Sequence, residues 1–382
     1  MSKSALKRRA REARLWLFDA CFPLWSERGT NAAGLFRECL TLDHTPADED
    51  TVRVRVQARQ TYVFAEAMKL GWKPDAARDE IEQGVRILSG IARREDGLSG
   101  RSLKADGSGF ADDTADLYDI AFSLYALAAS ARVLGEEEGA PAIASARALL
   151  DTLDMRLKDK VNGGYAEALP PPQRRCQNPH MHLLEACLAL HAADPEGGHI
   201  ARAADLVSLF DTRFTAGPGG LLGEFFAADW GAPDGDAARI VEPGHQFEWV
   251  WLLHAYARAA GVAVPDAAAR LYAFTLSTLD AEGRACMEVT RDGAVHDGAR
   301  RTWVQTEALK AHLALFEATG DERFAAAACR SYDALMDEHL TPDGGWIDHY
   351  DSDGHIVSAT MPASTGYHVV LAFAELIRIM GT

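Results

Sequence analysis

The chain has 382 residues, of which 48% are hydrophobic and 25% charged, and its formal net charge is −17. An acidic balance of this size argues against nucleic acid as a partner, because nucleic-acid footprints are rich in Lys and Arg. No stretch of about 18 apolar residues occurs, so no membrane span is expected. The basic N-terminal stretch Lys7–Arg11 continues at helical spacing and lacks the apolar run of a signal peptide.

Six cysteines are scattered along the chain without the paired spacing of a metal site. This usage is typical of reduced thiols in a cytoplasmic protein rather than of a disulfide or zinc framework. Glycine-rich phosphate loops, H-E-x-x-H motifs and nucleophile elbows do not occur either. We therefore expect a cytoplasmic protein without a metal centre.

A two-part pattern recurs six times along the chain, at intervals of roughly 60 residues, as in a repeat architecture. Its first part is a glycine-led turn, often with an acidic residue a few places on. These turns begin at Gly34, Gly97, Gly163, Gly220, Gly283 and Gly344.

The second part is the start of a largely apolar helix, and more polar helices lie between these starts. The apolar helices begin near Arg59, Leu117, Asn178, Pro243, Thr302 and Gly366. The more polar helices cover residues 75–92, 140–154, 199–210 and 323–338, and residues 15–25 supply the first outer helix. Residues 52–56 alternate with period two and form either a strand or an extension of the helix that follows.

A helix that is apolar nearly all round must be buried, whereas one with a single apolar stripe covers the core from outside. Six buried helices alternating with six outer ones predict an all-α fold, a closed (α/α)6 barrel with short β-hairpin loops. One repeat cannot bury its own apolar face, so residues 1–382 are predicted to form a single domain. An open helical solenoid is the alternative.

In a closed ring the N-terminal ends of the inner helices meet at one mouth. Residues from all six helix starts then converge there, namely Arg59, Asp119, His180, His245, Trp303 and His368. Three histidines at equivalent points of three repeats indicate acid–base chemistry. His180 falls in the first turn of its helix, where the helix dipole favours a neutral imidazole that can accept a proton. A polar residue near a solvated helix cap is the structural alternative.

Two side chains, Glu248 and Arg59, suit a supporting role at this mouth. Glu248 follows His245 by three positions, so its carboxylate is placed to fix the imidazole tautomer. Arg59 needs a partner in a buried interior, and either a substrate oxygen or Glu248 would serve. His182 lies two residues from His180 on a different helix face, so these two make a poor metal chelate.

Further candidates would bind a substrate directly. Arg239 is placed to hold hydroxyl groups, with a loop salt bridge as the alternative. The rings of Trp303 and Tyr62 suit the C–H faces of a sugar, although such rings often belong to the core. The full set of expected substrate-binding residues is Tyr62, Asp119, Asn178, Arg239, Trp303 and Gln305.

Four segments resemble the N-acylglucosamine 2-epimerase superfamily, which includes mannose isomerases and cellobiose 2-epimerases. They are residues 59–60 (RQ), 177–186 (QNPHMHLLEA), 245–249 (HQFEW) and 366–368 (GYH). The resemblance implies an (α/α)6 barrel, no cofactor, and two histidines that exchange protons with a sugar. By position these are His245 and His368, with Arg59, His180 and Glu248 as supporting polar groups.

The resemblance also implies a sugar isomerase or a sugar 2-epimerase. Residues 302–308 lack the histidine associated with cellobiose epimerases, and no long insertion makes room for a disaccharide. We therefore expect interconversion of unphosphorylated D-mannose and D-fructose through a cis-enediol, with His368 acting at C2 and His245 assisting. A phosphorylated sugar is not expected, because no basic cluster is evident near the mouth. The protein is expected to be a monomer or a homodimer.

Three other functions remain open at this point. Both histidines are present, so a sugar 2-epimerase fits the sequence equally well. An (α/α)6 glycoside hydrolase would use Asp119, Glu248 or Glu307 and would need two carboxyl groups about 5 to 9.5 Å apart across a groove. A non-catalytic toroid that binds sugars or a protein is the third.

Overall fold

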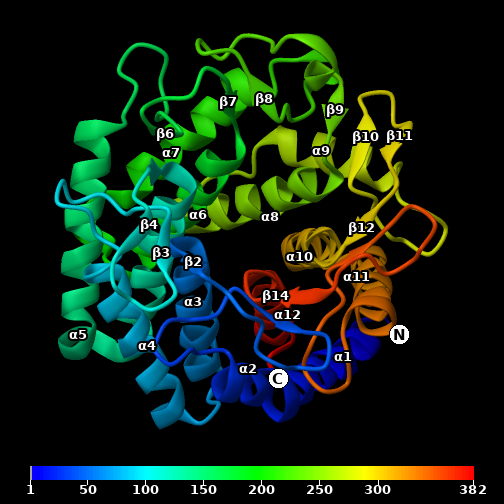
Figure 1. Ribbon diagram of the computed structural model, residues 1–382. Helices are drawn as coiled ribbons and strands as arrows, with labels where there is room; N and C mark the ends of the chain where they lie inside the picture. The colour runs from blue at the N-terminus through cyan, green and yellow to red at the C-terminus, as the bar shows by residue number, and fades with distance from the viewer. Residues whose placement is uncertain (1) are drawn as a thin grey trace.

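The computed structural model describes residues 2–382 and shows a closed ring of alternating inner and outer helices (Figure 1). Each inner helix contacts the next, and the last contacts the first, so the predicted toroid is confirmed and the open solenoid is not. In ring order the inner helices are α3 (Val54–Leu70), the first half of α5 (Leu117–Arg156), α6 (Asn178–Ala193), α8 (Pro243–Ala260), α10 (Thr302–Thr319) and α12 (Thr365–Met380).

The outer helices pack around this inner ring. They are α1 (Ser2–Trp16) with α2 (Phe22–Arg28), α4 (Pro74–Ser89), the second half of α5, α7 (His199–Leu209), α9 (Asp266–Leu276) and α11 (Glu322–Ala334). Short π-helical turns extend three of them: Leu17–Cys21 after α1, Phe210–Phe214 after α7, and Leu335–His339 after α11. The N-terminal helix α1 contacts both α11 and α12, which closes the outer layer.

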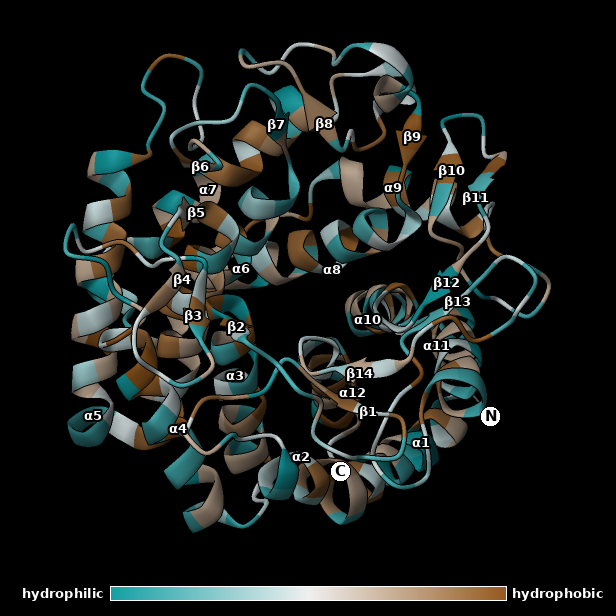
Figure 2. Ribbon diagram, viewed as in Figure 1, coloured by the Kyte–Doolittle hydropathy of each residue, from teal (hydrophilic) through white to brown (hydrophobic). Residues whose placement is uncertain are grey.

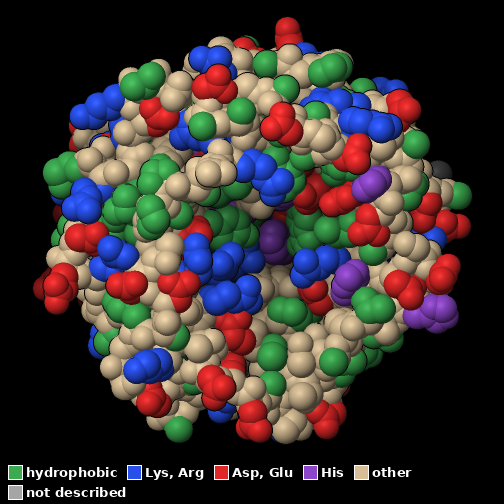
Figure 3. Space-filling view, turned by 45° about the horizontal axis from the view of Figure 1, so that its top comes forward, with side chains coloured by type: hydrophobic (Ala, Val, Ile, Leu, Met, Phe, Trp, Pro, Cys, Tyr) green, Lys and Arg blue, Asp and Glu red, His purple; other side chains and the backbone are tan. Residues whose placement is uncertain are grey.

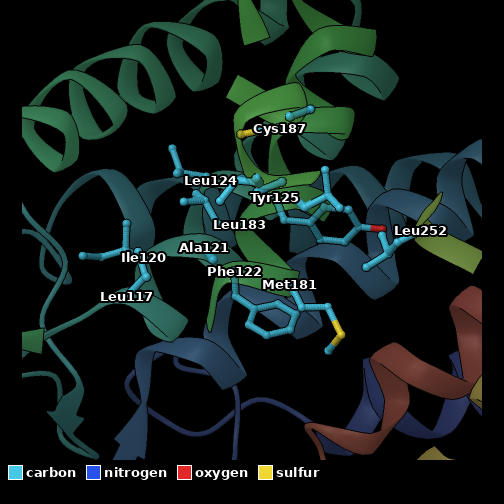
Figure 4. Close-up of a cluster of buried hydrophobic side chains, with 14 of the residues drawn as sticks. Leu117, Ile120, Ala121, Phe122, Leu124, Tyr125, Met181, Leu183, Cys187 and Leu252 are labelled. Carbon is cyan, nitrogen blue, oxygen red and sulfur yellow. The ribbon is translucent and has the colours of Figure 1, made fainter. Parts of the chain in front are cut away.

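Helix α5 supplies both the inner and the outer helix of one repeat because the chain turns inside it. Gly135 has φ 85° and ψ −178°, which breaks the helix between its inner and outer halves. By length and composition α5 could cross a membrane, but 72% of its most apolar stretch is buried inside the protein. Figure 4 shows Leu117, Phe122 and Leu124 from α5 packed with Leu183 and other residues of α6 in one apolar cluster.

Short antiparallel strands join the repeats at one end of the ring. The strands are β1 (Cys39–Thr41), β2 (Thr51–Arg53), β3 (Ser102–Lys104), β4 (Phe110–Asp112), β5 (Ala115–Asp116), β6 (Ala168–Leu169), β7 (Arg175–Cys176), β8 (Phe225–Phe226), β9 (Ile240–Val241), β10 (Glu288–Thr290), β11 (Val295–Asp297), β12 (Arg300–Arg301), β13 (His349–Tyr350) and β14 (Thr360–Pro362). Several pairings cross between repeats: β1 with β14, β2 with β3, β5 with β6, β7 with β8, β9 with β10, and β12 with β13. The strands therefore hold the loops of neighbouring repeats together. Strands β12 and β13 consist of hydrophilic residues (Figure 2).

All six repeat glycines have a positive φ, between 62° and 92°, a conformation that side chains with a Cβ rarely adopt. Two residues after the glycine, the backbone is usually anchored by a side chain of an inner helix. Gln57, Gln246 and Gln305 each accept from the N–H and donate to the C=O of that residue. His180 accepts the N–H of Tyr165 in the same way, at 3.0 Å. We call these four side chains the loop anchors.

Some predicted boundaries were wrong. The first inner helix begins at Val54 rather than near Arg59, and the alternating stretch before it is shared between strand β2 and that helix. The first outer segment is much longer than residues 15–25, since α1 begins at Ser2. In both places the apolar pattern alone did not mark where the helix starts.

Candidate active site

The N-terminal ends of the inner helices open into one cavity of about 300 Å³ at the hairpin end of the ring. Figure 3 shows this hollow near the middle of the face, with basic side chains around it and a histidine within it. Its lining comprises Arg53, Arg55, Arg59, Tyr118, Asn178, His182, Glu242, His245, Glu248, Met287, Arg301, Trp303, Ser364, Thr365 and His368. Six of the residues expected from the sequence meet here: Arg59, Asn178, His245, Glu248, Trp303 and His368.

His245 lies in the first turn of α8 between two carboxylates. Its Nδ1 donates to Glu224 Oε2 at 2.8 Å and lies 3.4 Å from Glu242 Oε2. Burial lowers the pKa of His245, but Glu242 and Glu224 outweigh it and raise this pKa to about 10. Glu248, which the sequence suggested as the partner, does not hold Nδ1. The two carboxylates therefore favour the protonated form of His245.

His368 lies in the first turn of α12 and has the opposite character. Its Nδ1 donates to Glu307 Oε1 at 2.9 Å, which leaves Nε2 as the acceptor. Burial, together with the positive charges of Arg59 and Lys310, lowers the pKa of His368 well below its usual range. Lys310 Nζ lies 2.6 Å from Glu307 Oε2, and both side chains are fully buried. Because Lys310 neutralises Glu307, the carboxylate orients the imidazole without drawing a second proton onto it.

Trp303 lies beside both imidazoles. Its ring centroid is 5.0 Å from that of His245 and 5.9 Å from that of His368. Asn178 Nδ2 lies 3.2 Å from His245 Nε2, while Asn178 Oδ1 is buried with no partner among residues 2–382. A protonated Nε2 requires an acceptor, so we expect the amide to be turned, with Oδ1 facing His245.

Arg59 is held deep in the cavity by neutral groups. It donates to Tyr118 Oη at 2.6 Å and to the Ser364 carbonyl at 3.2 Å, and its guanidinium lies 4.1 Å from the centre of the Phe122 ring. The expected ion pair with Glu248 does not form. The Arg59 charge is therefore uncompensated by a direct carboxylate contact and is available to an oxyanion.

Glu248 lies among other acids below the histidines. Burial and the nearby Glu307 raise its pKa well above the usual value. Its Oε1 is buried with no hydrogen-bond partner among residues 2–382, and it lies 3.9 Å from His182 Nδ1. Glu248 thus presents a carboxyl group to the cavity that a substrate hydroxyl would satisfy.

His182, and not His180, faces the cavity. His180 is a loop anchor with no exposed surface, and its neutral state comes from burial, which lowers its pKa to about 3. His182 lies edge-on to Tyr118 and close to Glu185, and burial lowers its pKa to about 4. The structure therefore does not bring His180 to the cavity lining.

Four other predicted site residues lie outside the cavity. Gln305 is a loop anchor, and Asp119 is fully buried against Arg55, where burial raises its pKa to about 7. Tyr62 lines a second cavity at the opposite end of the ring. Arg239 is largely exposed, 3.9 Å from Asp236. These side chains face the loops, the core or solvent rather than the mouth.

The inner-helix register explains what sequence reasoning missed. Each loop anchor is followed two residues later by a side chain facing the axis: Arg59, His182, Glu248 and Glu307. Asn178 and His182 are four apart and share a helix face, so Asn178 should have pointed to His182. No comparable signal marked Arg53, Arg55, Glu242 or Arg301, which reach the mouth from strand ends and first turns. The expectation of no basic cluster near the mouth was wrong.

Four groups of acidic and histidine side chains place possible metal-ligand atoms within 4.8 Å of one another. One of them, Asp351–Asp353–His355, lies outside the cavity, and the other three include residues of the cavity lining. These three are His182–Glu185–Glu248, Glu224–Glu242–His245 and Glu248–Glu307–His368. In the second group the charged imidazole itself supplies the positive charge, and in the third Lys310 does. The residues present thus compensate much of their own acidic charge.

A closed (α/α)6 toroid with one imidazole favoured in its protonated form and one in its neutral form at the same mouth is suited to acid–base chemistry. The sequence profile of the N-acylglucosamine 2-epimerase family matches residues 34–372. A mannose-6-phosphate isomerase of Rhizobium meliloti (strain 1021) is 37% identical over 94% of this chain and 95% of its own length. A D-mannose isomerase of Thermobifida fusca is 29% identical over 79% and 82% of the two chains. The structure of a cellobiose 2-epimerase from Spirochaeta thermophila DSM 6192 superposes with a TM-score of 0.87, at 25% identity, over 98% and 97%.

The chain belongs to the N-acylglucosamine 2-epimerase family, as the sequence resemblance suggested. It is an isomerase-type enzyme of the group that contains sugar isomerases and sugar 2-epimerases.

Proposed function

We propose that the protein interconverts an aldose and its 2-ketose through a cis-enediol, with D-mannose and D-fructose as the parent sugars. The observation that carries this proposal is that one cavity holds both His245, which lies between two carboxylates, and His368, whose partner Glu307 is paired with Lys310. Isomerisation needs an acid for an oxygen and a base for the C2 proton at the same pH. Because the two imidazoles have different partners, one is favoured protonated and the other neutral at the same pH.

In the proposed reaction His245 donates a proton to the ring oxygen as the pyranose opens. His368 Nε2 then removes the proton from C2, and its Nδ1–H remains bound to Glu307. Negative charge develops on the carbonyl oxygen as the enediol forms, and Arg59 stabilises it. Return of the proton from His368 to C1 completes the aldose-to-ketose conversion. His245 carries the oxygen protons: after it protonates the ring oxygen, it accepts the proton of the C1 hydroxyl as the aldehyde forms. It then donates this proton to O1 of the enediolate and accepts the proton of the C2 hydroxyl as the ketone forms, so both histidines end in their starting protonation states.

The size of the cavity supports a monosaccharide. A volume of about 300 Å³ is at the lower end of the roughly 300–1,000 Å³ common for small-molecule sites. Mannose is favoured over other hexoses because two relatives bear names that refer to mannose or its phosphate. The flat Trp303 ring beside both histidines offers a surface for the sugar C–H groups.

A deuterium-incorporation experiment tests this proposal. The protein is incubated in deuterated water with mannose, glucose, fructose, lyxose or cellobiose, and the products are identified by NMR. Aldose–ketose isomerisation predicts fructose from mannose, with deuterium at C1. Absence of ketose from every aldose would remove the proposal.

A 2-epimerase is the second candidate, because two imidazoles flank one aromatic ring and so could serve both faces of C2. In that case the same experiment gives the C2 epimer with deuterium at C2. The geometry does not favour a glycoside hydrolase. Asp119 lies outside the cavity, and the Glu248 and Glu307 oxygens lie within 4.8 Å of each other in one buried cluster rather than across a groove.

We also propose a cytoplasmic location and a reaction that needs neither metal nor cofactor. All six cysteines are unpaired, in keeping with a reducing compartment. Activity that persists after dialysis against a chelator would support the metal-free mechanism.

A further inference from the structure

The outer rim of the active-site cavity is more basic than the rest of this acidic chain. Arg53, Arg55 and Arg301 line the cavity above Arg59, whereas the only acidic side chains in the lining are Glu242 and Glu248. The whole chain carries a formal charge of −17. A positive rim on such a protein focuses anions toward one opening.

The three rim arginines are oriented by carboxylates that stay outside the cavity lining. Arg53 Nε donates to Glu38 at 2.8 Å, Arg301 Nη2 donates to Asp348 at 2.7 Å, and Arg55 Nε lies 3.1 Å from Asp119. Asp348 and Asp119 are almost completely buried. The carboxylates hold one edge of the Arg53 and Arg301 guanidinium groups by hydrogen bonds, and Asp119 forms an ion pair with Arg55, while all three residues line the cavity.

Donor capacity remains on all three side chains. Among residues 2–382, no acceptor bonds Nη1 of Arg53, Nη1 of Arg301, or either terminal nitrogen of Arg55. Planar guanidinium groups with free N–H donors match the oxygens of a phosphate. A phosphomonoester carries about −1.5 to −2 charges at pH 7, so it can be shared by several arginines.

The position of these arginines relative to the histidines sets which end of a sugar they meet. Arg53 and Arg301 cap the N-termini of α3 and α10, and their side chains are 42% and 38% exposed. His368 is only 7% exposed. Arg59 follows Arg53 by six positions, a rise of about 9 Å along the helix. A hexose with C1 and C2 at the histidines would therefore direct its far end to the rim.

We propose that Arg53, Arg55 and Arg301 form an anion subsite that binds the phosphate of a hexose phosphate while its C1–C2 end lies between His245 and His368. This inference rests on the proposed isomerase function and refines its substrate to a hexose bearing a phosphate at the carbon farthest from C1. The N-terminal dipoles of α3 and α10 add to the positive potential at that position.

Kinetics and calorimetry together test the subsite. The ratio of kcat/KM for mannose 6-phosphate to that for mannose is measured in the wild type and in Arg53→Gln/Arg301→Gln. We expect a wild-type ratio of at least about 10, a fall of at least about 10-fold in the double variant, mainly through KM, and a loss of affinity for mannose 6-phosphate of similar size in titration calorimetry. The variant Arg53→Lys/Arg301→Lys keeps the positive charges but loses the planar guanidinium donors. Its kcat/KM ratio is expected to lie between those of the wild type and the double Gln variant.

A control variant and two further outcomes show whether the anion subsite itself has failed. Arg86→Gln on α4 removes an exposed arginine far from the mouth and should leave the ratio unchanged. A wild-type ratio near one, or a ratio insensitive to both rim substitutions, would overturn the subsite while leaving isomerisation of mannose intact. A higher kcat/KM for mannuronate than for mannose 6-phosphate would overturn the assignment to phosphate.

The proposed function fails differently. If neither mannose nor mannose 6-phosphate is converted but calorimetry still shows arginine-dependent binding of mannose 6-phosphate, the subsite stands and the isomerase proposal does not. If that binding is also absent, the subsite is overturned as well. Circular dichroism of each variant confirms that it is folded.

Discussion

At the hairpin end of the ring, where the inner helices begin, the cavity holds four arginines, three histidines and two glutamates. At the opposite end, where the same helices finish, a second cavity of about 320 Å³ is lined mainly by alanine, leucine, tyrosine and tryptophan side chains. Among its charged residues, Glu66 pairs with Lys69 of the same lining, and Glu375 pairs with Arg378 outside it. The two ends thus share helices but not chemistry.

The contrast shows how a toroid concentrates reactivity at one end. The positive ends of six helix dipoles and the cross-repeat hairpins all lie at the hairpin end, so charged side chains there are oriented by neighbouring repeats. The two cavities are separated by a layer of side chains that contacts both of them. Glu185 lines the second cavity and also lies 3.2 Å from His182 of the first. Substitutions on either side of this layer therefore test whether the asymmetry is functional.

The largest effect is expected from His368→Ala and His245→Ala at the hairpin end. Each removes a proton carrier, so kcat on the preferred sugar should fall by about 10²- to 10⁴-fold, the usual contribution of general acid–base catalysis. Steady-state kinetics measure the loss. Substantial turnover in both variants would mean that the two imidazoles do not carry the protons.

A smaller loss is expected from Lys310→Met, which acts on the layer of side chains behind His368. Without Lys310, the Glu307 carboxylate loses its adjacent cation and draws a second proton onto His368, which then cannot act as a base. We expect kcat to fall by about 10- to 100-fold, the size typical when a partner behind an active-site histidine is removed.

The acid limb of the pH profile distinguishes this positioning role from simple destabilisation. Loss of the Lys310 charge raises the pKa of His368, so the acid limb of kcat/KM should move to higher pH. An unchanged limb with a lower melting temperature would show that Lys310 only stabilises the fold. Lys310→Arg keeps the charge and should restore the limb if the variant folds.

The alkaline limb reports on His245. Its pKa is raised to about 10, so the imidazolium acid is present at neutral pH and activity should fall as pH rises through about 10. The stabilisation from its carboxylate partners is complete below the unfolded pKa of about 6.5 and is lost as pH rises through the folded value. Activity and this contribution to stability therefore both decline as pH rises on the alkaline side.

Glu242→Gln should shift that limb without abolishing activity. Removing the carboxylate that raises the His245 pKa most should move the alkaline limb of kcat to lower pH by about one unit or more. Glu136→Gln, on an exposed part of α5, is the matched control and should not shift it. A limb that stays in place would show that Glu242 does not set the charge of His245.

The smallest effect is expected from Tyr62→Phe at the opposite end. Tyr62 lines the second cavity, so loss of its hydroxyl should change kcat/KM by less than about twofold. Kinetics and thermal melting of this variant measure both outcomes. A large loss of activity with an unchanged melting temperature would mean that the two ends are coupled through the side chains between the two cavities.

The sequence by itself determined the repeat, the alternation of inner and outer helices, and therefore the mouth at which distant residues meet. It also singled out His245, His368, Arg59 and Trp303, because helix starts can be recognised from local pattern. Apolar periodicity and glycines that require a positive φ are properties of short segments, so they are visible without tertiary contacts.

Only the tertiary structure decided which side chain of each helix start faces the axis. His180 and Gln305 turned out to anchor loops of their own repeat, while His182 took the position at the cavity. The charges of His245 and His368 were likewise undecided in the sequence, because Glu224 and Glu307 reach them from other parts of the chain. Helix phase and the electrostatics of buried groups depend on packing between repeats, and that packing exists only once the ring has closed.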